Sequence, residues 1–130
     1  MGASDVELVR ELFRRFGHAG LDSALELISE DAVFEIPGTM SAEPDVYEGH
    51  DGARRYFAGF EGLLNELRFE PLDFEEGDGA VTMWIRFRGR GVTSGIEVEQ
   101  YAAINVWVAD GKVIRMTPHP DMESARAELR

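Results

Sequence analysis

The chain contains no cysteine, few basic residues and no long apolar run. The absence of cysteine excludes disulfide bonds, thiolate metal sites and a cysteine nucleophile. Only 13 Lys and Arg residues stand against 25 Asp and Glu residues, which gives a formal net charge of -12. A charge of this sign repels phosphate backbones and anionic lipid surfaces, so we expect neither nucleic acid nor a membrane as a partner.

Targeting and membrane-spanning segments are also missing from the sequence. Residues 1–15 carry charges throughout and lack the apolar core of a signal peptide, and no later stretch approaches the length of a membrane span. We therefore expect a soluble cytoplasmic protein. At 130 residues, the chain predicts one domain over residues 1–130, which can bury a core without disulfides or a metal.

Motifs for metals and phosphates do not occur either. The sequence has no His-x-His or Glu-x-x-His spacing, and the glycines in residues 77–79 and 89–91 do not open a helix after a strand. We therefore expect no metal site and no cofactor.

The segment from Val81 to His119 predicts three long strands. Apolar residues recur at every second position in residues 81–87 and, with the exception of Gln100, in residues 96–108, which is the period of a strand with one buried face. A tight turn at Asp110 and Gly111 then leads into a further extended segment. Strands of this length form a twisted antiparallel sheet whose apolar face must be covered.

The remaining segments supply helices for that purpose. Apolar residues at helical spacing and a terminal cap at Asp121 identify the helices, and short alternating runs identify further strands. The expected elements are helices over residues 4–16, 21–28, 53–64 and 122–129, and strands over residues 31–36, 46–48, 67–75 and 112–117. Their order predicts an α+β domain with its helices on one face of the sheet.

The segment from Leu21 to Pro37 resembles the entry segment of the SnoaL-like branch of the nuclear transport factor two superfamily. The segments 47–52, 94–100 and 110–113 carry further resemblance to that branch. The resemblance implies a cone-shaped α+β barrel, in which a curved antiparallel sheet wraps around N-terminal helices and leaves a central cavity. It also implies a homodimer formed through the sheet. The fold hosts isomerases, cyclases, dehydratases, epoxide hydrolases and binding modules, so the activity must come from the site.

The ketosteroid isomerases of this superfamily provide a test of one specific chemistry. The resemblance places Ile36 at the position of their general base, Phe13 at that of their oxyanion tyrosine, and Asn105 at that of their partner acid. Neither Ile36 nor Phe13 can transfer or donate a proton, although the amide of Asn105 can donate a hydrogen bond. The resemblance therefore disfavours steroid isomerisation.

Two other polar groups each have two open interpretations. The resemblance to SnoaL-type cyclases implies that His119 and Asp121 could form an acid/base pair. Alternatively, Asp121 caps the terminal helix and His119 is partly exposed between two prolines. The second group contains two arginines and two glutamates, which could resemble the Asp-Arg-Asp arrangement of limonene epoxide hydrolases or form a cross-strand salt ladder on one sheet face. Its members are Arg86, Arg88, Glu97 and Glu99, and we favour the ladder.

The orientation of the long strand 96–108 presents a conflict. Strict alternation directs Ala102, Ile104 and Val106 toward the core, whereas the isomerase resemblance directs Asn105 and Tyr101 toward the cavity. A bulge near Gln100 would reconcile the two, because one extra residue exchanges the faces beyond it. Burial of the back of the sheet in a homodimer would also do so, and we favour the homodimer.

The sequence thus leaves two hypotheses for a protein that binds a small apolar or amphipathic molecule. The first is a cofactor-independent acid/base isomerase, cyclase or hydrolase, with catalytic candidates His119, Asn105 and Tyr101. The second is a binding or interaction module whose pocket has lost its chemistry. In both, the expected binding residues are Phe13, Phe34, Ile36, Tyr56, Trp84, Tyr101, Asn105 and Met116.

Overall fold

The computed structural model describes residues 2–18, 21–38, 45–77 and 79–130, apart from the side chains of residues 2–4, 17–18 and 59–64. In chain order the elements are α1 (Gly2–His18), α2 (Leu21–Leu25), β1 (Ile28–Ile36), β2 (Asp45–Glu48), α3 (Gly49–Leu63), β3 (Leu64–Glu76), β4 (Ala80–Gly91), β5 (Glu97–Ala109), β6 (Lys112–His119) and α4 (Met122–Glu128). Within these ranges, no helix combines the length and the apolar character needed to cross a membrane.

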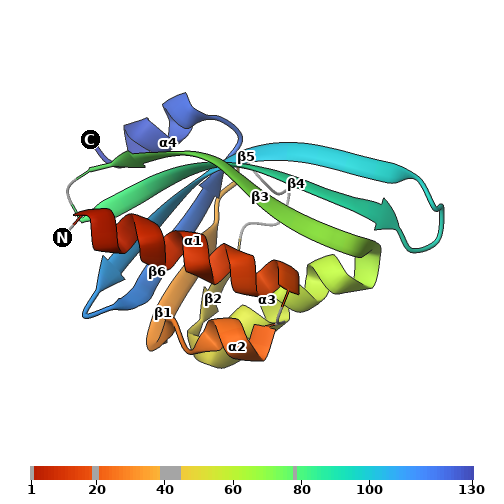
Figure 1. Cartoon of the computed structure of the whole chain (residues 1–130), viewed down its shortest axis with the longest axis horizontal. Helices are drawn as coiled ribbons and strands as arrows, with labels where there is room; N and C mark the ends of the chain where they lie inside the picture. Colours follow the sequence, from red (N-terminus) through yellow and green to blue (C-terminus); the bar gives the residue numbers. More distant parts are fainter. Residues whose placement is uncertain (1, 19–20, 39–44, 78) are drawn as a thin grey trace.

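The six strands form one curved sheet in the order β2-β1-β6-β5-β4-β3 (Figure 1). All neighbouring strands are antiparallel except β1 and β6, which are parallel. The expectation of a wholly antiparallel sheet is therefore wrong at this pair, because the chain returns to β1 only after crossing through α3 and the β3–β6 meander. The sheet also ends at β2 and β3 without joining them, so the expected barrel is an open cone.

The face of the sheet that packs against α1, α2 and α3 is called the inner face below. On this face of β4 and β5, Val81 lies opposite Val106 and Met83 lies opposite Ile104. These four side chains are buried, and they form one core with residues of the helices, among them Leu12. Burying an apolar side chain of this size contributes about 1.5–3 kcal/mol, so this layer stabilises the fold substantially.

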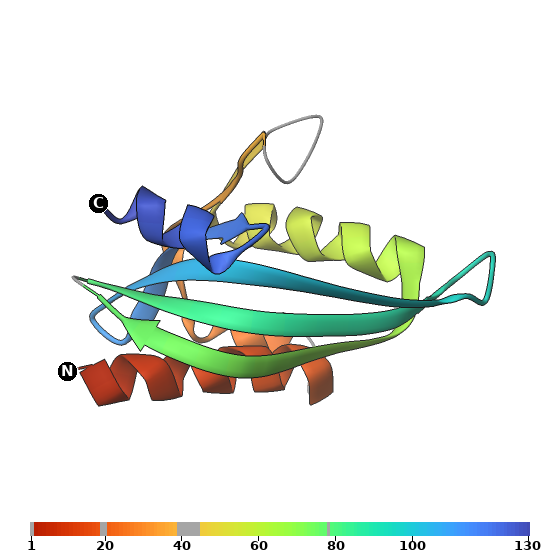
Figure 2. The same ribbon diagram turned by 90° about the horizontal axis from the view of Figure 1, so that it is seen from above.

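The helix α4 lies on the other side of the sheet, which is called the outer face below (Figures 1 and 2). The expectation that all helices cover one face is therefore wrong for α4. The predicted cap is confirmed, since Oδ1 of Asp121 accepts a hydrogen bond from the backbone N–H of Ser124 at 2.8 Å. Ala125 is the one buried residue of this seven-residue helix. So short a helix has too little apolar periodicity to indicate which face it covers.

Two predicted helix boundaries are also wrong. The second helix ends at Leu25 and not at residue 28, because Ile28 already belongs to β1. The third helix begins at Gly49, four residues before the predicted start. Gly49 has a φ of +69°, and the ring of His50 donates from Nε2 to the carbonyl oxygen of Ile28 at 2.7 Å. The hydrogen bond fastens the start of α3 to β1, and it depends on a residue distant in sequence.

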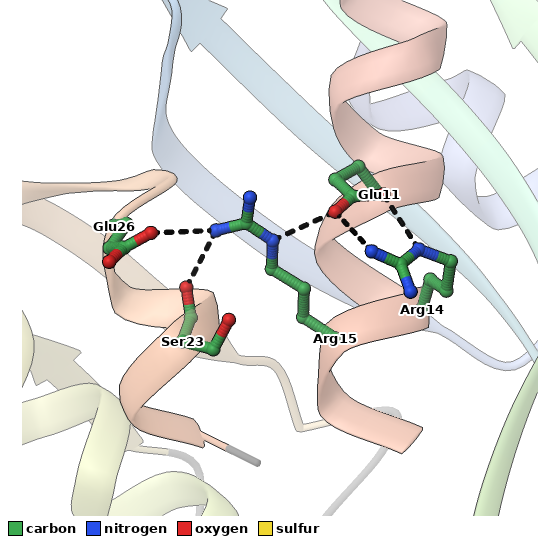
Figure 3. Close-up of polar contacts among 5 residues, drawn as sticks. All are labelled: Glu11, Arg14, Arg15, Ser23 and Glu26. Carbon is green, nitrogen blue, oxygen red and sulfur yellow. Dashed lines mark hydrogen bonds and ion pairs between the residues drawn. The ribbon is translucent and has the colours of Figure 1, made fainter. Parts of the chain in front are cut away.

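An arginine joins α1 to α2 and to the residue that follows it (Figure 3). Nη1 of Arg15 donates to the carbonyl oxygen of Ser23 at 2.9 Å and to Oε2 of Glu26 at 3.0 Å. Its Nε donates to Oε2 of Glu11 at 2.9 Å, and Arg14 donates twice to the same carboxylate. Hydrogen bonds from Arg14 and then from Arg15 lower the pKa of Glu11 to about 2.

The carboxyl group of Glu11 should therefore titrate with a pKa of about 2, well below the ordinary value of 4.5. Any stability that it contributes is present above pH 4.5 and is lost as the pH falls through 2, because the unfolded chain binds the proton more tightly. Side-chain NMR titration measures this pKa. Arg14→Gln and Arg15→Gln should each raise it, and an ordinary pKa in the wild type would contradict the arrangement.

Two glycines with positive φ allow a matched test of the α3 anchor. A Cβ at Gly49 would lie 2.9 Å from the carbonyl oxygen of Glu30, whereas a Cβ at Gly111, in the β5–β6 turn, would meet nothing within 4 Å. We expect Gly111→Ala to lower the free energy of unfolding by about 1–2 kcal/mol through backbone strain alone. Gly49→Ala should cost at least about 1 kcal/mol more, because overpacking adds to the strain. Equal effects in denaturant unfolding would show that the contact with Glu30 is unimportant.

Candidate functional site

Aromatic rings gather on the inner face between the helices and the sheet. This aromatic cluster consists of Phe13, Phe16, Phe34, Tyr47, Tyr56, Phe57, Phe69 and Phe87. The rings of Phe16 and Phe57 are 4.1 Å apart between centroids, and those of Phe34 and Tyr56 are stacked at 6.1 Å with an interplanar angle of 11°. Edge-to-face and offset contacts of this kind contribute beyond the burial of area, so the rings support one another.

Several predicted binding residues lie in or beside the aromatic cluster. Phe13, Phe34 and Met116 are almost fully buried, and Ile36 follows Phe34 by two residues on the same strand face. Burial, with a smaller contribution from the neighbouring Tyr47, raises the pKa of Tyr56. The hydroxyl of Tyr56 therefore stays protonated near neutral pH and can act as a hydrogen-bond donor, but not as a base.

The other predicted binding residues lie on the outer face. Trp84 and Tyr101 stack there with centroids 5.6 Å apart, and Asn105 lies on the same face. The pairing of β4 with β5 runs without a shift past Gln100, so the bulge considered as one resolution is absent. Strict alternation thus predicts the faces correctly, and the placement of Asn105 in the cavity by analogy with isomerases is wrong. The sheet separates the eight expected binding residues into two groups.

A buried polar network anchors α4 to the outer face. Oδ1 of Asn105 accepts from Thr82 at 2.6 Å, and its Nδ2 donates to the carbonyl oxygen of Ala125 at 2.9 Å and to Oε1 of Glu128 at 2.8 Å. His119 Nε2 lies 2.9 Å from the same oxygen of Glu128. A carbonyl and a carboxylate can only accept, so the orientation of the Asn105 amide and the donor role of Nε2 follow from their partners.

His119 and Asp121 do not form a pair with each other. Asp121 is the helix cap, and hydrogen bonds from Ser124 lower its pKa. His119 is 8% exposed and pairs with Glu128, not with Asp121, so its expected partial exposure is wrong. Sequence reasoning did not identify Glu128 as a member of this network. One pattern could have indicated it, because a helix capped by Asp121 places Ala125 and Glu128, three residues apart, on the same side.

Ion pairs line the outer face of β3 and β4. Nη2 of Arg86 donates to Oε2 of Glu70 at 2.6 Å, and Arg88 lies 3.5 Å from the other oxygen. The hydrogen bond from Arg86 lowers the pKa of Glu70. A cross-strand ladder is therefore present, but its acid is Glu70 and not Glu97 or Glu99. Glu99 instead accepts a hydrogen bond from the hydroxyl of Tyr101 at 3.0 Å.

A polar groove of about 420 Å³ lies at the far end of the same face. A register shift in β3 opposite Gly89, where Glu66 has a φ of +55°, bends the strand beside it. The groove is lined by Glu66, Arg68, Arg88, Gly89, Glu97, Val98 and Glu99. Charges of both signs surround it, so it differs from the central apolar cavity implied by the resemblance, which stays a prediction.

No three His, Asp or Glu side chains in the described part of the chain are grouped as metal ligands. The buried polar side chains among the described residues are Thr82, Asn105, Thr117 and His119, and all four lie on the outer face. The aromatic cluster and these four polar side chains therefore lie on opposite sides of the sheet.

A model of the SnoaL-like domain matches residues 9–116. The chain belongs to the SnoaL-like domain family. No curated protein matches the sequence significantly.

Solved structures resemble this SnoaL-like protein over nearly its whole length. An NTF2-like protein of unknown function from Burkholderia pseudomallei K96243 is 19% identical, with a TM-score of 0.78 and 95% of each chain covered. TerC, co-crystallised with polyporic acid, is 20% identical, with a TM-score of 0.78 and 97% of each chain covered. The epoxide hydrolase/cyclase-like enzyme SalBIII, which acts in pyran ring formation in the polyether salinomycin, is 22% identical, with a TM-score of 0.75 and 92% of each chain covered. At these identities the similarities show the fold alone.

The polar network predicts a large cost for removing Asn105. Asn105→Leu should lower the free energy of unfolding by about 3 kcal/mol, because Thr82, Ala125 and Glu128 each lose a partner in a buried setting. Denaturant unfolding measures the change. Gln100→Leu, at an exposed position of the same strand, should change stability by less than about 0.5 kcal/mol. A similarly small effect of Asn105→Leu would mean that the network contributes little.

Proposed function

We propose that this SnoaL-like protein binds a small apolar or amphipathic molecule at the aromatic cluster, without acid/base catalysis there. The observation that carries the proposal is the division of chemistry between the two faces. Aromatic side chains converge on the inner face, whereas the buried polar side chains of the described residues are all on the outer face. Apolar and aromatic surfaces with few polar groups are typical of small-molecule sites.

Tyr56 gives the site its polar contact. Its ring stacks on Phe34 and touches Tyr47 and Phe57, with centroids 5.5 and 4.8 Å away. A hydroxyl that stays protonated can donate one hydrogen bond to a ligand oxygen and so orient an amphipathic molecule. The ligand enters beside Tyr47, because that residue is half-buried and belongs to β2, a four-residue edge strand. Movement of so short an edge strand disturbs few contacts.

An acid/base enzyme is the alternative, and its support comes from proteins of the same fold. TerC and SalBIII show that ligand binding and epoxide hydrolase/cyclase-like activity occur on this fold. The matching groups in this protein would be His119 and Glu128, which touch each other beneath α4. Since the sheet lies between them and the aromatic cluster, they cannot reach a ligand bound among the rings. This separation favours binding over catalysis at the inner face.

A ligand screen tests the proposal. The purified protein is heated with steroids, polyketide fragments, epoxides or small lactones, and one class should raise the melting temperature by roughly 10 °C at a concentration 100 times its Kd. Tyr56→Phe should weaken the binding of an oxygen-containing ligand about fivefold, because one hydrogen bond is lost. Tyr101→Phe, a matched change on the outer face, should leave the affinity unchanged. Equal loss in both variants, or no ligand from any class, would contradict the proposal.

The homodimer through the sheet remains part of the proposal. Its support is the partly exposed aromatic surface of the outer face, where Tyr101 is 44% exposed beside Trp84. Aromatic side chains are enriched in protein interfaces. Native mass spectrometry should show a dimer, and Tyr101→Glu should shift the population toward the monomer. A monomer in the wild type at micromolar concentration would overturn this part.

A further inference from the structure

Two side-chain donors of the sheet converge on one oxygen of Glu128. Nδ2 of Asn105 is 2.8 Å and Nε2 of His119 is 2.9 Å from Oε1 of that carboxylate. Both distances lie in the range of hydrogen bonds to charged acceptors. Donors that come from adjacent strands and meet at one point form a site for an anionic oxygen, much as paired donors do in oxyanion holes.

Asn105 is held by hydrogen bonds to residues other than Glu128, and His119 is held by burial at the end of its strand. Asn105 is fully buried, and its amide is fixed by Thr82 on one side and by the backbone of Ala125 on the other. His119 is nearly buried at the end of β6, where it lies opposite Ala103 of β5. Asn105 therefore keeps its hydrogen bonds with Thr82 and Ala125 when the Glu128 side chain is absent, and burial between the strands and α4 limits the movement of His119.

Thr117 indicates independently that the site can accept a further hydrogen-bonding atom. It lies opposite Asn105 on the same face, so Thr82, Asn105 and Thr117 form a row across three strands. Its Oγ1 is buried and has no hydrogen-bond partner in the described part of the chain. A buried hydroxyl without a partner is costly, and a second oxygen brought by a ligand would relieve that cost.

Glu128 is a partly exposed occupant of this site at the end of its helix. It is the last residue of α4, its side chain is 21% exposed, and a carboxylate at the C-terminal end of a helix is disfavoured by the helix dipole. Rotation about its side-chain bonds would vacate the site while Ala125 remains in contact with Asn105. The site can therefore open without unfolding of the helix.

We propose that Asn105 and His119 form a binding site for small carboxylates on the outer face, and that Glu128 occupies this site as an internal competitor. The ligand class is a carboxylic acid anion, because the group now bound there is a carboxylate. The site is separate from the aromatic cluster, so it does not depend on the function proposed above.

The test removes the competitor and adds acetate. In Glu128→Ala, acetate should bind saturably, with shifts in the side-chain amide signals of Asn105 and the ring signals of His119 followed by NMR. Wild-type protein should bind acetate at least about tenfold more weakly, because the binding-competent state is rarely populated. Glu123→Ala, which removes an exposed carboxylate from the same helix, should behave as the wild type. Sodium chloride at equal ionic strength controls for screening.

Two outcomes would overturn the proposal. One is the absence of saturable shifts in Glu128→Ala, and the other is equal acetate affinity in Glu128→Ala and the wild type. If Glu128→Ala does not fold, Glu128→Gln carries the same test, because a neutral amide competes less well than a carboxylate for the two donors. Acetate should then bind Glu128→Gln severalfold more tightly than the wild type, and equal affinity would again refute the site.

Discussion

The unbroken register between β4 and β5 determines which groups can meet in this protein. Pairing continues without a shift from Ala80–Trp107 to Arg90–Glu97. Because side chains alternate with a period of two, an unbroken register determines for each residue of β4 and β5 whether it lies on the inner or the outer face. Ile104 joins the helices on the inner face, and its neighbour Asn105 meets α4 on the outer face. The aromatic cluster and the pair formed by His119 and Glu128 therefore lie on opposite faces of the sheet.

The two faces are consequently stabilised by different interactions. The inner layer depends on the area of apolar surface that it buries, and such layers tolerate changes of side-chain shape when volume is kept. The outer layer has Ala125 as its one buried helix residue and depends on hydrogen bonds to Asn105 and His119. The exposed ion pair between Arg126 and Glu75 adds little, since water screens it. A buried polar layer of this kind is stable only while its partners are kept.

The parts of the fold that depend on local period could be predicted from the sequence, and the parts that depend on distant contacts could not. Alternation assigned Ala102, Ile104 and Val106 to the core correctly, and the cap at Asp121 is also correct. The helical start at Gly49 was missed because its determinants, Glu30 and Ile28, lie in β1. For the same reason the partner of His119 could not be identified, since only the fold brings Glu128 to it.

Assigning residue roles on a strand by alignment with a related protein is less reliable than assigning the fold. A gap of one residue in the alignment exchanges the faces of a strand, so an isomerase position assigned to Asn105 falls on the wrong side, next to the inner-facing Ile104. Helical positions tolerate small errors, because an apolar helix face is about 100° wide and includes several neighbouring residues. Phe13 is such a position, and it is buried in the aromatic cluster. The helix and the sheet thus agree on an apolar inner surface, because Phe13 of α1 and Ile104 of β5 are both buried there.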